Sequence, residues 1–268
     1  GDNLILNGSI DDVRIYNRAL SEVEVATLYE LEKPKTALET GLVAYYPFNG
    51  NAKDESGNGN DGTVNGATLA TDRNGESGKA YQFVKGSLIE VDISEWKVNV
   101  STTHTISAWA RYDSFSSTYN HLVNIGSHPC GSFSQILQTG NNPQTIVLDT
   151  GKGCSSPWTQ VSAVGPSIGR WYHYLIVYKE GVSTFYVDGL TAGNSDKLNG
   201  SFDQADLLWL GGHAGHADHY GQLDDVRIYN RALSEAEVAA LYELEKPKTK
   251  IEWTKLEYLL DGNLNEKG

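Results

Sequence analysis

The stretch WYHYLIVYKEGVSTFYVDG, from Trp171 to Gly189, decides the fold class. It holds two runs of β-branched and aromatic residues, and alternation of this kind is typical of half-buried β-strands. Glu180 and Gly181 separate the runs, and a two-residue connection of this type joins antiparallel strands. The stretch therefore predicts a β-hairpin.

Strand signals recur along most of the chain, separated by clusters of Gly, Asn, Asp and Ser. The clearest are LVAYYPF (Leu42–Phe48), KAYQFV (Lys79–Val84), TISAWARY (Thr105–Tyr112) and LDDVRIY (Leu223–Tyr229). Two tryptophans in strand-like runs, Trp109 and Trp171, are expected in the core. Many short strands with little helix predict an all-β fold, a two-sheet antiparallel jelly-roll sandwich.

One convincing helix follows Ser234. The Ser234 hydroxyl is placed to cap the helix, and Glu237 is placed three residues later to reach back to the capping residue. We expect one face of this helix to pack against a sheet through Val238, Leu241, Tyr242 and Leu244.

Composition and charge exclude several classes of protein. The 268 residues include 34 acidic and 21 basic side chains, a formal charge of −13. A protein that follows a phosphate backbone needs an excess of Lys and Arg, so we expect no nucleic-acid partner. The longest apolar runs are far shorter than the roughly 18 residues of a membrane helix, so we expect no membrane insertion.

An internal repeat sets the expected organisation. The 26 residues from Asp11 to Thr36 return from Asp224 to Thr249 with only two differences, Val23/Ala236 and Thr27/Ala240. Because a repeat of this length indicates copies of one unit, we expect neighbouring copies of the domain as partners. Since the chain contains no methionine, we also expect it to be a piece of a longer protein.

We therefore predict three parts. Residues 1–37 are the last strand and helix of an upstream copy, residues 38–249 are one complete domain, and residues 250–268 are a linker or the degenerate start of a downstream copy. The severed strand, Ile10–Tyr16, is expected to add to another sheet edge, because an unpaired strand exposes backbone groups and an apolar face.

The loop DESGNGNDG, Asp54–Gly62, is rich in oxygen-bearing side chains. Calcium takes six to eight oxygen ligands on a tightly turning loop, and this loop can supply several. The same residues also make ordinary turns without any metal. The residues alone leave both interpretations open.

Several segments in order resemble the laminin G-like, concanavalin A-like jelly-roll module of secreted bacterial proteins. The resemblance rests on GLVAYYPFNGNAKDESGNGNDG, HTISAWARY, RWYHYLIVYKEGVSTFYVDG, LWLGG and QLDDVRIYNRALSEAEVAALY, and covers Leu38–Tyr242. It implies the fold, and it implies a structural calcium ion between the early loop and the start of the last strand. Carried onto this chain, the ligands are Asp54, Asn58 or Asn60, and Asp224.

EVDISE, Glu90–Glu95, resembles the catalytic strand of family-16 glucanases, in which paired carboxylates cleave a glycosidic bond. Strand alternation places Glu90 and Asp92 on one face, and Glu95 joins them only if a β-bulge intervenes. A glycosidase based on Glu90, Asp92 and Glu95 is therefore an alternative, and a routine outer strand is the favoured interpretation.

Three histidines, His213, His216 and His219, recur at every third position in GGHAGHADHYG. A loop can gather such side chains around zinc, but no thiolate or clear fourth ligand accompanies them. We therefore favour a solvated connection and keep His213 as a ligand-binding candidate.

Sugar binding needs aromatic rings that stack on pyranose faces. Trp158, Tyr220 and Tyr119 lie in loop-like sequence and are the candidates, with half-burial against the sandwich as the alternative for each.

Cys130 and Cys154 enclose a polar, turn-rich stretch. We favour a disulfide between them over two free thiols, because thiols in such sequence would be exposed to oxidation. In the chain-entropy model a bridge closing a loop of this size stabilises the fold by about 3 kcal/mol.

Together these observations predict a non-catalytic binding or adhesion module on the cell surface or outside the cell, stabilised by calcium, with a glycan or cell-surface partner. The first alternative is a structural repeat that builds a fibre or stalk through strand contacts between copies, and the second is the glycosidase.

Overall fold

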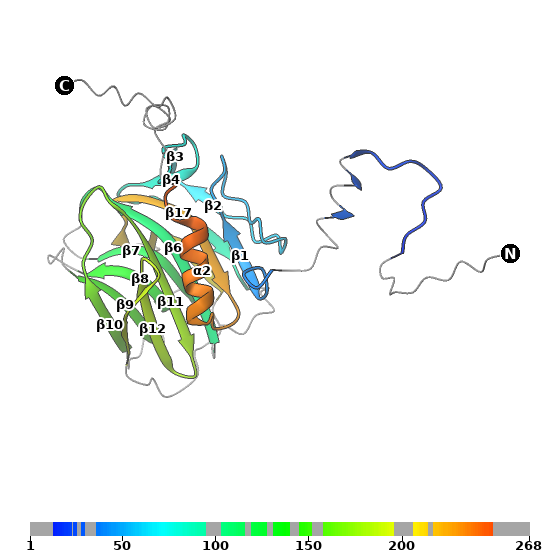
Figure 1. Cartoon of the computed structure of the whole chain (residues 1–268). Coiled ribbons are helices and arrows are strands. Elements are labelled where there is room, and N and C mark those ends of the chain that lie inside the picture. Colours follow the sequence, from blue (N-terminus) through cyan, green and yellow to red (C-terminus); the bar gives the residue numbers. More distant parts are fainter. Residues whose placement is uncertain are drawn as a thin grey trace, which may run out of the picture. The chain divides into compact units, whose positions relative to one another are not determined.

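The structure is a computed structural model. It describes residues 13–22, 24–25, 28–29, 36–94, 103–115, 119–127, 131–139, 145–151, 158–195, 206–213 and 217–248. The chain forms two compact units, Gly1–Thr40 and Gly41–Gly268. Figure 1 shows the strands of the second unit and the helix α2.

The first of two large sheets, sheet A, has the strand order β13-β12-β11-β6-β17-β4-β3, and β1 pairs with the end of β17. Its strands are β1 (Leu42–Tyr46), β3 (Thr68–Ala70), β4 (Ala80–Phe83), β6 (Thr103–Tyr112), β11 (Trp171–Lys179), β12 (Val182–Val187), β13 (Leu190–Asn194) and β17 (Gly221–Tyr229). All strand pairs in it are antiparallel.

The second sheet, sheet B, has the order β10-β9-β8-β7-β14-β5-β2. Its strands are β2 (Thr63–Asn65), β5 (Leu88–Asp92), β7 (Tyr119–Ser127), β8 (Gly131–Thr139), β9 (Thr145–Gly151), β10 (Trp158–Val164) and β14 (Leu207–Leu210). A small hairpin pairs β15 (Gly212–His213) with β16 (Ala217–Asp218). The predicted two-sheet antiparallel jelly-roll sandwich is confirmed.

The hairpin that decided the fold class forms as predicted, between β11 and β12. Lys179 pairs with Val182, so Glu180 and Gly181 are the whole connection. Both have positive φ angles, 50° and 91°, as the tight turn that matches the strand twist requires.

The inner faces of the two sheets supply the core. Sheet A contributes Tyr46, Phe83, Ile106, Tyr174, Phe185, Val226 and Ile228, and sheet B contributes Ile89, Val91, Val123, Ile125, Leu208 and Leu210. The residues between these core positions, such as Trp109, His173, Glu90 and Trp209, therefore lie on the outer faces.

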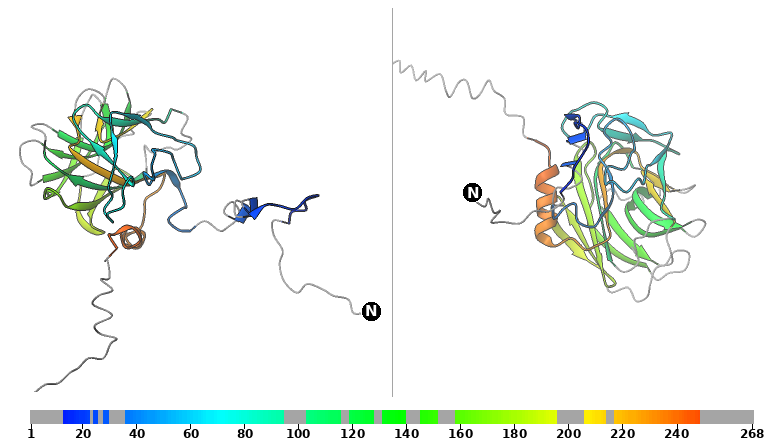
Figure 2. Two further views of the ribbon diagram at one scale, coloured as in Figure 1. Left: turned by 90° about the horizontal axis from the view of Figure 1, so that it is seen from above. Right: turned by 90° about the vertical axis from the view of Figure 1, so that its right-hand side faces the viewer.

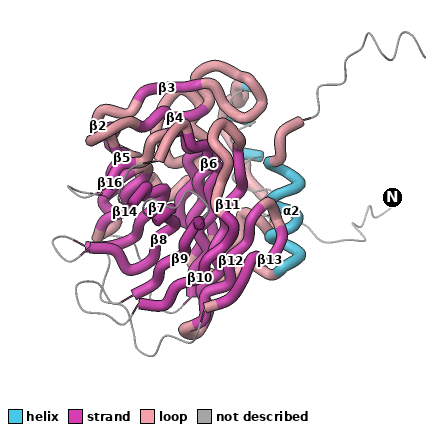
Figure 3. Tube along the Cα trace, turned by 90° about the vertical axis from the view of Figure 1, so that its left-hand side faces the viewer, coloured by secondary structure: helices cyan, strands magenta, loops and turns pink. Residues whose placement is uncertain are grey.

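The single helix in the described residues of the second unit is α2 (Glu235–Glu245), capped by Ser234 and Glu237 as predicted. It covers the outer face of sheet A, and the opposite side of the sandwich carries β14 and β16 (Figures 2 and 3). Val238 and Leu241 are buried, but Leu244 is 65% exposed, so its predicted packing is wrong. Glu245 lies on the buried face instead, because its carboxylate meets Arg227 and Trp109 there.

Trp109 is buried, but between sheet A and α2 and not between the two sheets. Trp171 is only half-buried.

In the first unit, the described part of the predicted strand, Val13–Tyr16, forms no strand. Helical residues follow Ser21, and Ser21 and Glu24 make the same reciprocal cap as Ser234 and Glu237. The helix start therefore forms from local sequence, whereas the strand does not.

Candidate functional site

A row of side chains on the outer face of sheet B is the best candidate site. Trp209 of β14 lies between Glu90 of β5 and Asn124 of β7, and Thr63 of β2 pairs with Glu90. Directly opposed residues of antiparallel strands point to the same face, so these residues form one line across four strands.

Direct contacts hold the row together. The Trp209 indole N–H donates to Glu90 Oε2 at 2.9 Å, and Asn124 Nδ2 lies 2.7 Å from Nδ1 of His121. The His213 ring lies edge-on to Trp209, with 4.7 Å between ring centroids. Trp209, Asn124 and His121 are buried, and Glu90 and His213 are half-buried.

The β15–β16 hairpin contacts β5 and β7, which explains the burial of the row at this end. The chain turns into this hairpin at Gly211, which has φ +75°. A Cβ at Gly211 would overlap the Phe83 ring, so only glycine fits there. Because this turn redirects the chain, the His213 ring packs against Trp209.

The strand register extends the row across the rest of sheet B. Asn124 pairs with Gln135 of β8, Gln135 with Asp149 of β9, and Asp149 with Gln160 of β10. For these three residues the structure describes the backbone only. All three carry amide or carboxylate groups, the residue types that bind sugar hydroxyls. We call the seven positions Thr63, Glu90, Trp209, Asn124, Gln135, Asp149 and Gln160 the sheet B row.

Two of the three residues of the glycosidase alternative, Glu90 and Asp92, lie in the described part of the chain. Glu90 accepts the Trp209 indole hydrogen bond. Asp92 is exposed, and hydrogen bonds from the Ser94 hydroxyl and backbone lower its pKa. A general acid needs the opposite shift, because it must hold a proton near neutral pH. Glu95 lies outside the described residues.

Of the four predicted sugar-binding residues, the structure describes the side chains of Tyr220 and His213. Trp158 begins β10 and Tyr119 begins β7, so both are strand residues and not loop residues, and their side chains lie outside the description. Tyr220 is half-buried and its backbone oxygen accepts from Asp113 N at 2.9 Å. Of the four, His213 joins the sheet B row.

The histidine segment is not simply a solvated connection. His219 is fully buried beside Tyr112 and Phe83, and burial lowers its pKa to about 4. His213 packs on Trp209, and His216 lies outside the described residues. His213 and His219 have different neighbours, because the β15–β16 hairpin reverses the chain between them.

The Asp54–Gly62 loop closes on itself and on β1. The Asp54 carboxylate accepts backbone N–H groups of Tyr45, Ser56 and Asn60 at 2.8 to 3.0 Å. The side-chain amides of Asn58 and Asn60 both donate to the carbonyl of Val43. This hydrogen bonding is that of an Asx-rich turn.

Asp224 belongs to a different network, centred on Arg73. The Arg73 guanidinium bridges Asp224 and Asp225, and its Nε donates to the Glu245 carbonyl at 2.6 Å. A β-bulge follows Asp224, and Asp225 has φ +41°, so two consecutive carboxylates reach one guanidinium. Without the bulge, strand alternation would place Asp225 on the face opposite to Asp224.

The rest of this network ties α2 to sheet A. Arg227 donates to Glu245 Oε1 at 2.6 Å, the Trp109 indole donates to Glu245 Oε2 at 3.0 Å, and Tyr45 donates to Asp225 at 2.6 Å. We call this group the Arg73 cluster; its charged members are Arg73, Arg227, Asp224, Asp225 and Glu245. Three carboxyls therefore face two guanidinium groups in a buried site.

Burial and the neighbouring charges shift the pKa values of the groups in and beside this cluster. Burial raises the pKa of Glu245 to about 7, and burial together with Asp225 raises that of Asp224 to about 8. Burial and the two arginines lower the pKa of the neighbouring His173 to about 3, so that histidine stays neutral.

The predicted calcium ligands have protein partners in this arrangement. Asp224 is occupied by a guanidinium group, which repels a cation, and Asp54 is occupied by backbone N–H groups. Across the residues that are described, no group of three or more His, Cys, Asp or Glu side chains is arranged to hold a metal ion. The calcium ion held by Asp54, Asn58 or Asn60, and Asp224 stays a prediction.

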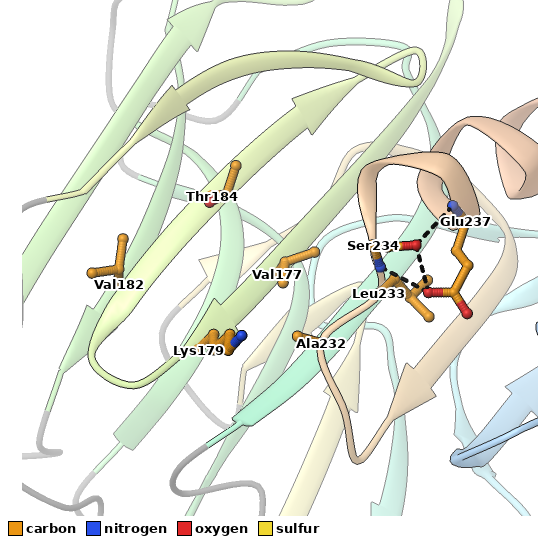
Figure 4. A pocket seen from close by; sticks show the side chains of 8 residues that line it. All are labelled: Val177, Lys179, Val182, Thr184, Ala232, Leu233, Ser234 and Glu237. Atoms are coloured by element: carbon orange, nitrogen blue, oxygen red, sulfur yellow. Dashed lines mark hydrogen bonds between the residues drawn. The ribbon is translucent and has the colours of Figure 1, made fainter.

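A pocket of about 430 Å³ lies between the β11–β12 hairpin and the start of α2 (Figure 4). Its wall is lined by Val177, Lys179, Val182, Thr184, Ala232, Leu233, Ser234 and Glu237. The two polar groups at the helix start, Ser234 and Glu237, bond to each other, so the pocket offers few free hydrogen-bonding groups there.

The predicted disulfide has no structural outcome, because Cys130 and Cys154 both lie outside the described residues. Over the described ranges, no helix is long and apolar enough to cross a membrane.

The fold and the polar outer face define the chain as a two-sheet jelly roll of the kind found in lectins and glycan-processing proteins. Residues 85–239, more than half of the chain, match the laminin G-like family of the concanavalin A-like lectin/glucanases superfamily. The chain belongs to this superfamily, as the resemblance implied.

Solved structures share the fold at low sequence identity. Domain 4 of AbnA, a GH43 extracellular arabinanase from Geobacillus stearothermophilus solved in complex with arabinotriose, is 23% identical with a TM-score of 0.58, and the match covers 75% of this chain and 98% of that one. The binding domain of botulinum neurotoxin serotype D is 15% identical (TM-score 0.61, 77% and 52% covered). The binding domain of Paraclostridial Mosquitocidal Protein 1 is 20% identical (TM-score 0.59, 76% and 52% covered). This chain spans about half the length of the two toxin chains.

Proposed function

We propose that this protein is a non-catalytic carbohydrate-binding module and that the sheet B row is its binding site. The observation that carries the proposal is the register of that row, which aligns Glu90, Trp209 and Asn124 and continues through three more amide or carboxylate residues. Of the described members, Thr63 is exposed and Glu90 is half-buried, so these two can meet a sugar, whereas Trp209 and Asn124 are buried and support the row from within. Amide and carboxylate groups in a line suit an extended chain of sugar units, since each unit offers several hydroxyls.

The row binds through hydrogen bonds more than through ring stacking. The Trp209 ring is buried under His213, so its indole acts by holding the Glu90 carboxylate in place. Glu90 is half-buried and retains acceptor capacity for a sugar hydroxyl. Hydrogen bonds to a charged group are each worth about 1.5–3 kcal/mol.

The proposal of binding without cleavage rests on the carboxyl groups. A retaining glycosidase needs two carboxyls roughly 5.5 Å apart, one of them a protonated acid. Glu90 instead bonds to an indole, and Asp92 is held ionised by Ser94. The arabinanase relative is a separate domain of an enzyme, solved with arabinotriose, and this supports a sugar ligand for the fold.

An extracellular or cell-surface location is part of the same proposal. It is supported by the extracellular arabinanase among the structural relatives and by the favoured Cys130–Cys154 disulfide, which would persist only in an oxidising compartment.

The test is glycan-array screening of the full chain, followed by calorimetry on the best oligosaccharide. Glu90→Gln preserves an acceptor for the Trp209 indole but removes the charge, and we expect at least tenfold weaker binding. Asp149→Asn, in the same row, is expected to weaken binding similarly. Glu55→Gln, on the exposed Asp54 loop, is the matched control and should bind as the wild type does.

The proposal fails if Glu90→Gln and Asp149→Asn bind the array ligand with unchanged affinity. Release of reducing sugar from a polysaccharide by the wild type, lost in Glu90→Gln, would support the glycosidase alternative instead. Wild-type melting temperatures in each variant show that the fold is intact.

A second function, structural assembly through contacts between copies, is favoured by one observation. In the first unit, Val13, Ile15 and Tyr29 are exposed apolar residues, with Ile15 at 94%.

A further inference from the structure

The chain carries two copies of the segment that closes the sandwich. We call Gly221–Glu245, which forms β17 and α2, the closing segment, and Gly8–Glu32 the tail copy. From Asp11 onward the two differ only at Val23/Ala236 and Thr27/Ala240 in this range. Both Ala236 and Ala240 are exposed on α2, so neither difference touches the packed face.

The closing segment fills a central slot in sheet A. Its strand β17 pairs with β6 along one edge and with β1 and β4 along the other. Val226, Ile228 and Tyr229 are fully buried there, and Val238 and Leu241 of α2 are buried beside them. A sandwich without this segment would expose the edges of three strands.

The tail copy has the sequence that this slot requires, beyond its apolar pattern. At Gly221 a Cβ would overlap the Arg111 carbonyl oxygen of β6, so only glycine fits. The tail copy has Gly8 at that position, followed by Ser9 and Ile10 where β17 has Gln222 and Leu223. It therefore satisfies the tightest steric constraint of the slot.

The charges also match. The closing segment supplies Asp224, Asp225, Arg227 and Glu245 to the Arg73 cluster. The corresponding residues of the tail copy are Asp11, Asp12, Arg14 and Glu32. Inserted in the slot, the tail copy would meet Arg73 and Trp109 of the acceptor with the same groups.

Outside such a slot the packed face of the tail copy is exposed. Ile15 is 94% exposed where Ile228 is 0%, and Val13 is 71% exposed where Val226 is 0%. The helix start is nevertheless preformed, because Arg18 and Glu24 pair at 2.6 Å as Arg231 and Glu237 do at 2.7 Å. The tail copy thus presents a preformed helix cap and an exposed apolar segment, Val13–Tyr16, that forms no strand.

We infer that the tail copy binds a second copy of this chain, in the slot between β6 and β1, in place of that copy's β17 and α2. Each chain has one closing segment and one tail copy but only one slot. The tail copy therefore binds a sandwich whose own closing segment has left the slot. Because the tail copy in the slot would make the same contacts as the closing segment, a defect in the closing segment shifts the exchange toward the tail copy of another molecule.

The test is a mixing experiment between full-length chains. The acceptor is a tagged double variant, Ile15→Asp with Ile228→Asp, which has neither a competent tail copy nor a competent closing segment. It is refolded by dilution together with untagged wild-type chain, which is the donor. We expect the donor to be captured on the tag, and the complex to have about twice the mass of the 29.3 kDa chain by light scattering.

The matched control donor is Ile15→Asp, whose sandwich is closed and whose tail copy carries a charge on its apolar face. We expect its capture to be at least tenfold weaker, because a charge would have to be buried, whereas Ile15→Val should be captured as the wild type is. A milder acceptor, Ile15→Asp with Ile228→Ala, repeats the comparison with less aggregation.

Equal capture of the wild-type and Ile15→Asp donors overturns the inference, and so does capture of neither by both acceptors. If the acceptor folds and elutes as a monomer, its slot is filled without a second molecule. The inference that the segment comes from a second copy of the chain is then wrong. Glycan binding of the donor is measured in parallel, so that failure of the sheet B row and failure of the exchange are distinguishable.

Discussion

Neutralising Glu245 should remove the contribution of this one carboxyl to the pH dependence of stability. Glu245 is 3% exposed and faces both arginines of the Arg73 cluster, which holds three carboxyls against two guanidinium groups. Glu245→Gln keeps an acceptor for only one of the two donors, Arg227 and Trp109, and leaves two carboxylates against two cations. The lost acceptor lowers the stability equally at every pH, so it does not affect the comparison between pH values. The substitution thus changes the charge balance with little change in shape.

The magnitude follows from the pKa of Glu245, which burial raises from its ordinary value of 4.5 to about 7. A carboxyl with a raised folded-state pKa binds its proton more tightly in the native state, so its stabilising effect is complete below pH 4.5 and is lost as the pH rises through 7. At 1.36 kcal/mol per pKa unit, the loss between pH 5 and pH 8 is about 2.5 kcal/mol. For a domain of this size that corresponds to about 5–10 °C in melting temperature.

The assay is urea denaturation followed by tryptophan fluorescence at pH 5 and pH 8, for the wild type and for Glu245→Gln. Glu243→Gln is the matched control, because Glu243 is exposed on the same helix and loses the same charge. We expect the wild type and Glu243→Gln to lose about 2.5 kcal/mol more than Glu245→Gln on going to pH 8. Parallel pH dependence in all three proteins would refute the charge-balance argument.

Three other predictions concern the scaffold. Gly221→Ala should destabilise the sandwich by at least about 2 kcal/mol, measured by urea denaturation, because its Cβ would overlap the backbone of β6; a change under about 0.5 kcal/mol would contradict the packing described. The calcium prediction requires a melting temperature several degrees higher in millimolar calcium than in EGTA, with the difference abolished in Asp54→Asn, and coincident melting curves would remove it. The disulfide prediction requires Cys130 and Cys154 in one cross-linked peptide by mass spectrometry without reductant; alkylation of both thiols in the native, unreduced chain would contradict it.

Strand alternation and turn chemistry were sufficient to predict the sandwich. The β11–β12 hairpin was readable because each strand alternates and Gly181 follows Glu180. The core positions followed from the same period of two. The packing of α2 was only partly readable, because Glu245 replaces Leu244 on the buried face. Whether Leu244 or Glu245 is buried depends on Arg227 and Trp109, which are distant in sequence.

The candidate site could be predicted from the sequence much less well than the fold. Glu90 stood out only as a possible catalytic carboxylate, and His213 only as one of three regularly spaced histidines. Trp209 and Asn124 carried no signal, because a tryptophan or an asparagine within a strand is unremarkable. The sheet B row exists only when β5, β14 and β7 are aligned in register, and that alignment joins residues up to 119 positions apart.

The two copies of DDVRIYNRALSE separate local from tertiary determinants within one molecule. In both copies the serine and glutamate cap the helix and the arginine pairs with that glutamate, because all three groups lie within seven residues. The sequence alone determines that feature. Only β17 is a strand, however, since its backbone N–H and C=O groups find partners on β6 and β1, whereas Val13–Tyr16 form no strand. A strand is completed by hydrogen bonds to other segments, so the tertiary structure decides where VRIY becomes one.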